Sequence, residues 1–252
     1  LNGVERVVVS QIIRSPGVFF TATSFYGRKL FGAKIIPNRG AWLEFETDIN
    51  GVIWVKIDRR RKVLVTTLLR FFGVETNQEI ENIFKEDVKG AEIDYIKETL
   101  QRDTTRNRNE AMIEIYSHLR PSDLPTLENA KGFLEAMFFD PKRYDLSEVG
   151  RWRMQQRLGI SKNSDQENCL LTKRDIILTI KEIIKLNKDP KAEPDNIDHL
   201  GNRRIRTLSE LLDSRLKVAM LRIERNIKDK MSTIEPDEAE PKNIINPRPF
   251  AS

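Results

Sequence analysis

The chain is organised around the run Ile197-Asp198-His199-Leu200-Gly201-Asn202-Arg203-Arg204-Ile205-Arg206. Within it, one carboxylate, one imidazole, one amide and three guanidinium groups surround Gly201, where the backbone can turn tightly or approach a ligand closely. Arginine forks suit phosphates and guanine edges, and a carboxylate accepts hydrogen bonds from base amino groups. The run therefore indicates contact with a nucleic acid. The alternative is a salt bridge between Asp198 and an arginine at the start of a helix.

Six blocks resemble bacterial-type RNA polymerase β subunits, in the order that this family shows. They are NGVERVVVSQ at 2–11, RSPGVFF at 14–20, IPNRGAW at 36–42, IDRRRK at 57–62, FDPKRYDL at 139–146 and IDHLGNRRIR at 197–206. Because the blocks span nearly the whole chain, the resemblance is far more specific than a single motif.

Composition is compatible with a globular protein that binds a polyanion. The 252 residues are 39% hydrophobic and 32% charged, and the formal net charge is +5. One cysteine excludes a disulfide framework, and two widely separated histidines make a histidine metal cluster unexpected. The sequence shows no signal peptide and no apolar run of membrane-spanning length. We expect a reduced cytoplasmic compartment at the nucleoid, and a plastid variant stays open.

Periodicity predicts an α+β fold: a small antiparallel sheet, a mainly helical remainder and a long helix from an incomplete domain. Strands are expected at residues 7–9, 12–13, 34–36, 42–46 and 52–57, with Asn50-Gly51 as a hairpin turn. Helices are expected at residues 66–72, 92–101, 107–119, 146–158 and 173–186. Two others are expected to begin after a capping box of Thr76 with Glu79 and after the capping residue Thr126. Thr172 is expected to cap the helix at 173–186. Residues 161–168 are expected to form a loop.

A long helix is predicted to run from Thr207 to about Lys230, opened by a capping box of Thr207 and Glu210. Its apolar stripe is more typical of a core face than of a partner groove. The acidic segment 236–241 follows it. The chain starts without methionine and ends without a terminating structure, so we expect an internal piece of a longer protein.

No constellation of residues predicts catalysis or a metal site in this chain. His118 falls inside an amphipathic helix and is expected to be structural. Cys169, beside two leucines, is more typical of a small hydrophobic residue than of a reactive thiolate. The resemblance agrees, because it implies that the catalytic Mg²⁺ is bound by the partner β′ subunit.

The basic residues predict a DNA-binding surface, since each neutralised phosphate strengthens binding. Trp42 has the chemistry to stack a base, with a place in the core as its alternative. The predicted DNA-binding residues are Arg14, Arg39, Trp42, Arg59, Arg60, Arg61, Ile197, Asp198, Arg203, Arg204 and Arg206. For any single arginine, plain surface solvation is the alternative.

The resemblance assigns domains and roles. It implies that residues 1–5 end a protrusion segment, 6–199 form the lobe and 200–252 return to the protrusion. It implies that Arg14, Ile197, Asp198 and Arg203 line a pocket for a guanine of the unwound non-template strand, and that Trp42 stacks a neighbouring base. Two further residues, Val9 and Gln11, match the edge of an inhibitor pocket.

The function that follows is part of a DNA-directed RNA polymerase, a nucleotidyltransferase, with DNA, the α, β′ and ω subunits and sigma factor as partners. The rival interpretation is a free-standing basic nucleic-acid-binding module without enzyme activity. A small hydrolase would need a catalytic cluster that the sequence does not offer.

Overall fold

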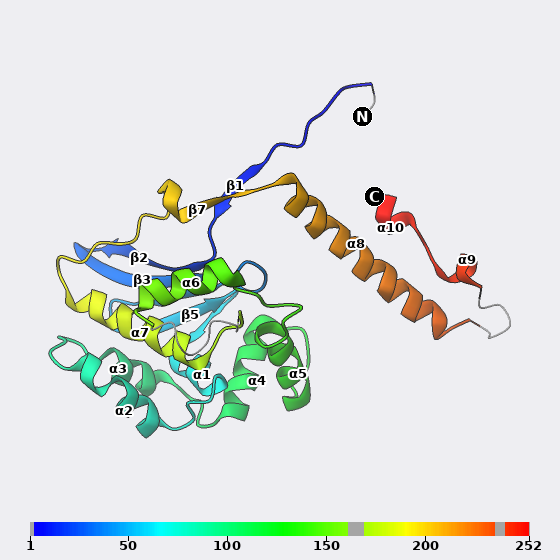
Figure 1. Ribbon diagram of the computed structural model, residues 1–252. Coiled ribbons are helices and arrows are strands. Elements are labelled where there is room, and N and C mark those ends of the chain that lie inside the picture. Colours follow the sequence, from blue (N-terminus) through cyan, green and yellow to red (C-terminus); the bar gives the residue numbers. More distant parts are fainter. Residues whose placement is uncertain (1–2, 161–168, 235–239, 252) are drawn as a thin grey trace. The chain divides into compact units, whose positions relative to one another are not determined.

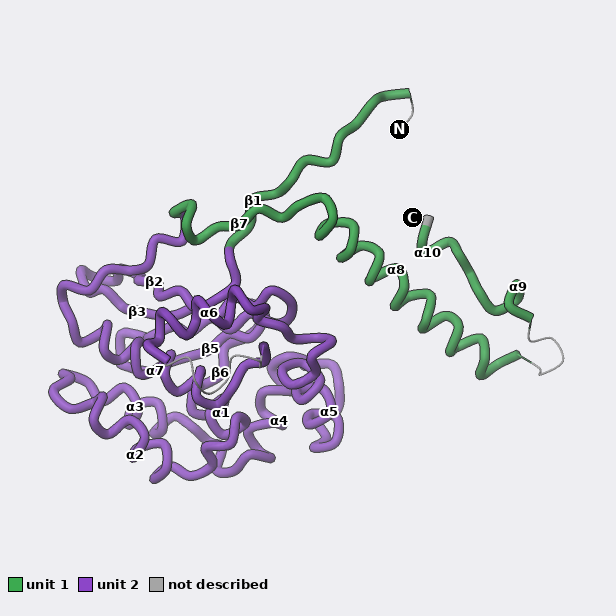
Figure 2. The backbone as a smooth tube through the Cα atoms, viewed as in Figure 1, with its two compact units in different colours: residues 1–14, 199–252 green, residues 15–198 purple. Residues whose placement is uncertain are grey.

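The computed structural model describes residues 3–160, 169–234 and 240–251. The predicted loop at 161–168 and most of the acidic segment 236–241 lie outside the described residues. Two compact units divide the chain: unit 1 comprises Leu1–Arg14 and His199–Ser252, and unit 2 comprises Ser15–Asp198 (Figure 2). Residues 6–14, assigned to the lobe from the sequence, therefore pack with the C-terminal segment. The names lobe and protrusion stay predictions.

An antiparallel sheet forms one layer of unit 2, with its strands in the order β2-β3-β4-β5-β6 (Figure 1). The strands are β2 (Gly17–Phe25), β3 (Arg28–Ile36), β4 (Leu43–Thr47), β5 (Ile53–Ile57) and β6 (Lys62–Leu64). Asn50 and Gly51 lie in the predicted hairpin between β4 and β5, where Gly51 has φ +78° and donates its N–H to the Asp48 carbonyl at 2.9 Å.

The β2–β3 hairpin is longer than its sequence suggests. The predicted short strand at 34–36 is only the end of β3, and β2 was not predicted. The distal half of the hairpin is largely exposed, and its apolar residues, such as Phe25 and Tyr26, do not alternate regularly with polar ones, which is the pattern by which strands are recognised. Its two-residue turn places both Tyr26 and Gly27 at positive φ, as the favoured tight hairpin turns require.

Within its described residues, unit 2 also contains seven helices. They are α1 (Val65–Phe71), α2 (Asn77–Val88), α3 (Tyr95–Arg102), α4 (Arg108–Leu119), α5 (Leu127–Phe138), α6 (Ser147–Leu158) and α7 (Lys173–Lys188). α6 packs against β2 and α7 against β3, whereas α1 contacts β5, β6 and α4. One apolar core joins the inward side chains of the strands to these helices, so the α+β prediction is confirmed.

The predicted capping residues open their helices. Thr76, Thr126 and Thr172 each accept a hydrogen bond from the backbone N–H three residues later. The box predicted for Thr76 is only half formed, because the Glu79 carboxylate accepts the N–H of Glu75 at 3.3 Å and not that of Thr76. Thr172 additionally forms a reciprocal capping box with Asp175. At these three positions the hydrogen-bond donor lies in the same helical turn as the threonine, so the signal is local.

Unit 1 contains a two-stranded ribbon of β1 (Gln11–Arg14) and β7 (Arg203–Arg206), preceded by the short helix η1 (Leu200–Asn202). The strand predicted at residues 7–9 is wrong: Val7 is 88% exposed, and β1 begins only at Gln11. The register pairs Gln11 with Arg206, and the chain then enters α8 (Leu208–Met231), so no continuation of β7 lies opposite residues 7–9. α9 (Pro241–Ile244) and α10 (Arg248–Ala251) follow.

The predicted extent of α8 is confirmed, but its capping box is wrong. Thr207 makes no side-chain capping hydrogen bond; its Oγ1 lies 2.9 Å from the Ser209 hydroxyl oxygen. Glu210 instead accepts from Arg204 at 2.6 Å and lies near Arg206. The stripe on α8 is also not a core face within the described residues, since none of the helix is buried.

Glu210 offers a titration test of this arrangement. Its hydrogen bond from Arg204 lowers the pKa of the Glu210 carboxyl, so we expect NMR titration to give a value below about 4.3, the ordinary pKa of a glutamate. Because folding lowers the pKa of Glu210, the ion pair adds its full stability to the fold only at pH values above the unfolded-state pKa. This stability is lost as the pH falls through the folded-state pKa. In Arg204→Gln the Glu210 pKa should rise; an unchanged value would contradict the ion pair.

Candidate nucleic-acid interface

The predicted DNA-binding residues fall in both units. Unit 1 carries Arg14, Arg203, Arg204 and Arg206, together with the two inhibitor-edge residues Val9 and Gln11. Unit 2 carries Arg39, Trp42, Arg59, Arg60, Arg61, Ile197 and Asp198.

In unit 1, the ribbon places two predicted pocket residues opposite each other. Arg14 on β1 pairs with Arg203 on β7. Directly opposed residues of an antiparallel pair project from the same face, so these two guanidinium groups share one face of the ribbon. Gln11 lies opposite Arg206 at the other end, and Val9 is 75% exposed on the segment before β1.

In unit 2, Trp42 lies just before β4 and is half-buried. The Arg59 guanidinium carbon lies 5.0 Å from the centre of its ring, a cation–π arrangement. The backbone also joins the two segments, because Asp58 donates its N–H to the Trp42 carbonyl at 2.8 Å. The blocks at 36–42 and 57–62 therefore meet at this tryptophan.

The turn that carries Arg59 has an unusual backbone. Asp58 and Arg59 have φ of 51° and 59°, in the left-handed region that residues other than glycine rarely adopt. Arg60 closes the turn by donating its N–H to the Ile57 carbonyl at 3.0 Å. Such residues cost of order 1–3 kcal/mol each and are found most often at functional sites. Arg60 and Arg61 are exposed beside them.

A third block, at 139–146, holds the loop that carries Arg39. The backbones of Arg39 and Asp145 exchange two hydrogen bonds, of 3.0 and 2.8 Å, and Arg39 Nη2 donates to the Pro141 carbonyl at 3.0 Å. The structure thus joins three of the six blocks: 57–62 contacts Trp42, and 139–146 contacts Arg39 in the block that ends at Trp42. The supporting residues Asp58, Pro141 and Asp145 were not predicted, because their roles depend on contacts between distant segments.

Ile197 and Asp198 end a segment that is docked on β2. Asp195 donates its N–H to the Phe20 carbonyl and accepts the Phe20 N–H on Oδ2, both at 2.8 Å. Asp198 itself is exposed, and its N–H reaches Asn196 Oδ1 at 3.1 Å.

Comparison of the sequence with known proteins shows the family of the chain. The model of the family described as RNA polymerase Rpb2, domain 2, matches residues 14–206. The chain is a member of this family. It is 44% identical to proteins named DNA-directed RNA polymerase subunit beta from Dehalococcoides mccartyi and Syntrophomonas wolfei, and 41% identical to that of Gloeobacter violaceus. Each comparison covers the whole chain but only 20–22% of the relative, so the chain spans about a fifth of their length.

The resemblance to bacterial-type β subunits is therefore confirmed. The matched domain begins at Arg14, the last residue of β1, and ends at Arg206, the last residue of β7. No predicted role for a single residue is tested by these similarities, so the roles at Trp42 and Asp198 stay predictions.

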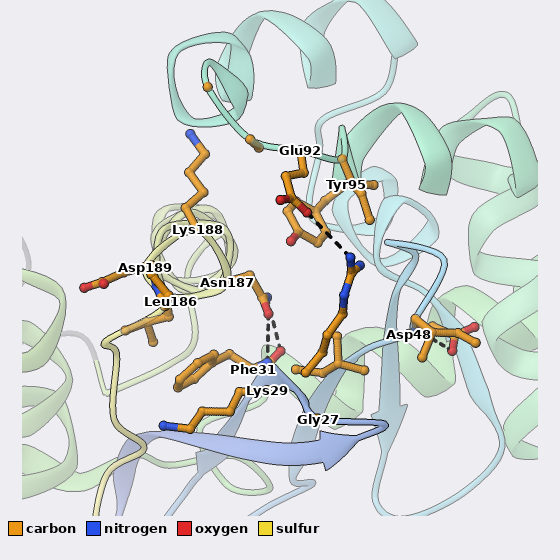
Figure 3. A pocket seen from close by; sticks show the side chains of 17 residues that line it. Gly27, Lys29, Phe31, Asp48, Glu92, Tyr95, Leu186, Asn187, Lys188 and Asp189 are labelled. Atoms are coloured by element: carbon orange, nitrogen blue, oxygen red, sulfur yellow. Dashed lines mark hydrogen bonds and ion pairs between the residues drawn. The ribbon is translucent and has the colours of Figure 1, made fainter.

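A pocket lies away from these residues. The pocket, of about 470 Å³, lies between the β2–β3 hairpin, the loop before α3 and the end of α7 (Figure 3). Its wall includes the ion pair of Arg28 and Glu92, and none of the predicted DNA-binding residues lines it. Within residues 3–160, 169–234 and 240–251, no cluster of His, Cys, Asp or Glu suits a metal ion, and no helix is long and apolar enough to cross a membrane.

The two residues considered for catalysis occupy ordinary structural positions. His118 Nδ1 lies 3.0 Å from the Glu114 carbonyl oxygen, one turn earlier in α4. Burial raises the pKa of the Cys169 thiol, which disfavours the reactive thiolate.

Proposed function

We propose that this chain works as part of the β subunit of a DNA-directed RNA polymerase, where it contacts downstream DNA and the unwound non-template strand. The observation that carries the proposal is the exposed Arg59 lying over the half-buried Trp42, with Arg60 and Arg61 exposed in the same turn. The assembled enzyme would transfer nucleotides with Mg²⁺ held by the β′ subunit, alongside α, ω and sigma. The chain itself would position DNA.

Phosphate binding is supported by the exposure of Arg14, Arg39, Arg59, Arg60 and Arg61. Guanidinium groups bind phosphate oxygens in a bidentate manner, and each neutralised phosphate releases counterions. Arg204 and Arg206 already lie against Glu210, so we assign them a smaller share of the binding energy.

Base recognition is assigned to two groups. Trp42 would stack an unpaired base, and Asp198, which is exposed, would accept hydrogen bonds from the amino edge of a guanine. In unit 1, Arg14 and Arg203 would donate hydrogen bonds to DNA from their shared face of the ribbon.

The test is fluorescence anisotropy of labelled forked DNAs across a salt series. Trp42→Ala should weaken binding to every single-stranded sequence by about 1–3 kcal/mol, the usual contribution of base stacking on an aromatic side chain. Asp198→Ala should remove a preference for guanine of about 1–3 kcal/mol and leave other bases unaffected.

Arg61→Ala is the matched control, because it removes an exposed charge from the same surface without touching the Trp42 ring. It should weaken all DNAs and reduce the salt slope by about 1. If Trp42→Ala and Asp198→Ala both bind as the parent does, the base-specific roles are wrong for this chain.

A further inference from the structure

The position of Arg59 matters for any base that stacks on Trp42. Its guanidinium carbon lies 5.0 Å from the ring centre, within the spacing of 4.5–7 Å that separates stacked aromatic rings. The guanidinium group therefore occupies one face of the indole at the distance where a base would lie. A base and this guanidinium group cannot both occupy that face of Trp42.

Two features hold Arg59 in this place. The left-handed turn at Asp58 and Arg59 is hydrogen-bonded to the Trp42 carbonyl, so the backbone directs the side chain toward the ring. At the other end, Arg59 Nε lies 3.9 Å from Glu44 Oε1. The Arg59 side chain is 73% exposed and that of Glu44 only 13%, so the carboxylate is the fixed partner and the arginine the movable one.

Glu44 is itself positioned by the sheet. Its Oε2 lies 2.9 Å from Lys34 Nζ on the neighbouring strand β3, opposite Glu44 in the register. A single carboxylate on β4 thus links a lysine of the sheet to the arginine above Trp42. The sheet supplies a second example of a cation over an indole, Lys62 Nζ at 4.7 Å from the Trp54 ring, which provides an internal comparison.

We propose that Arg59 is a gate on Trp42. Without DNA it covers the indole; an unpaired base displaces it from the ring, and the released guanidinium group binds a phosphate of the same strand. Glu44 is a positioning residue: its ion pair with Arg59 favours the arrangement in which Arg59 covers the indole. This inference rests on the proposed role of Trp42 in base stacking, and it adds that the stacking face is covered until a single strand arrives.

The first experiment needs no DNA. In the full chain with Trp54→Phe and Trp152→Phe, Trp42 is the remaining tryptophan, and acrylamide quenching reports its accessibility. Arg59→Ala should raise the quenching constant about twofold, and Glu44→Gln should raise it by less. Lys62→Ala, which removes the cation that lies over the ring at position 54 and not over Trp42, should leave the constant unchanged. If Arg59→Ala does not raise the constant, Arg59 does not cover Trp42.

The second experiment separates stacking from phosphate contact. Each variant is titrated with a single-stranded oligonucleotide that carries either thymine or an abasic site at one position, and the ratio of the two affinities reports stacking alone. Arg59→Ala should raise this ratio by about twofold to fivefold, the equivalent of one exposed cation–π contact, although total affinity falls. Arg61→Ala should lower both affinities and leave the ratio unchanged.

The outcomes are distinguishable. If the ratio falls in Arg59→Ala, the arginine stabilises the base on Trp42, and the gate proposal is wrong. If Trp42→Ala has the same ratio as the parent, Trp42 does not stack the base, and the proposed function is wrong whether or not Arg59 covers the ring. A raised ratio in both Arg59→Ala and Glu44→Gln is the result that supports the gate.

Discussion

Asp175→Ala is expected to destabilise the chain by about 3–5 kcal/mol, measured by urea unfolding followed by circular dichroism. Asp175 and Arg151 are 2% and 3% exposed, and Arg151 Nη1 lies 2.8 Å from both carboxylate oxygens. Removal of the carboxylate leaves the charge of the buried guanidinium group uncompensated, which costs far more than an exposed ion pair contributes. The same carboxylate completes the capping box of α7, so part of the loss comes from the helix start.

The double variant Arg151→Met with Asp175→Leu separates these two contributions. Two apolar side chains of similar size remove the buried charge, so most of the stability should return and a deficit of about 1 kcal/mol from the lost cap should remain. A double variant as unstable as Asp175→Ala would mean that the loss is due to packing or capping and not to an uncompensated charge.

Gly40→Ala is expected to destabilise unit 2 by about 2–6 kcal/mol, as the sum of about 1–3 kcal/mol for the backbone and about 1–3 kcal/mol for overpacking. Gly40 has φ +121°, and a Cβ atom there would lie 2.6 Å from Tyr144 Cδ2 and 3.1 Å from the Arg143 carbonyl oxygen. Tyr144 is fully buried and its ring centre lies 5.9 Å from that of Phe138, so it has little room to move.

Gly27→Ala is the matched control, because Gly27 also has a positive φ, of +80°, but a Cβ there meets nothing within 4 Å. Urea unfolding of the two variants therefore separates backbone strain, which both share, from the clash at Tyr144. Equal losses would contradict the steric account. Because Gly40 lies between Arg39 and Trp42, its alanine variant should also lower the thymine-to-abasic affinity ratio, whereas Gly27→Ala should not.

Tyr144 links the two variants, since it contacts the Gly40 loop and lies near the buried ion pair. Burial, and then the negative charge of Asp175, raise the pKa of its hydroxyl. The burial of Tyr144 was not predicted from the sequence, where the residue was noted only as part of the block FDPKRYDL. Its place in the core explains why that block supports the Arg39 loop: the tyrosine anchors the segment whose backbone pairs with Arg39.

The errors in the sequence predictions have a common cause. Thr207 and Glu210 have the right spacing for a capping box, yet Glu210 binds Arg204 because β7 brings that guanidinium group within reach. Residues 7–9 have strong β propensity, yet they form no strand because the partner strand ends at Arg206. In the first case a competing arginine takes the carboxylate, and in the second the pairing partner is missing, so the local signal alone was not sufficient.

The sequence by itself determined the family, the α+β class, the β4–β5 hairpin, the caps at Thr76, Thr126 and Thr172, and the extent of α8. Each of these depends on residue order or on neighbours a few positions apart. Only the tertiary structure decided that Arg59 covers Trp42, that Arg39 rests on the segment around Asp145, and that Arg151 is buried against Asp175. Those arrangements join segments up to about a hundred residues apart, and no periodicity along the chain records which charged side chain will meet which partner.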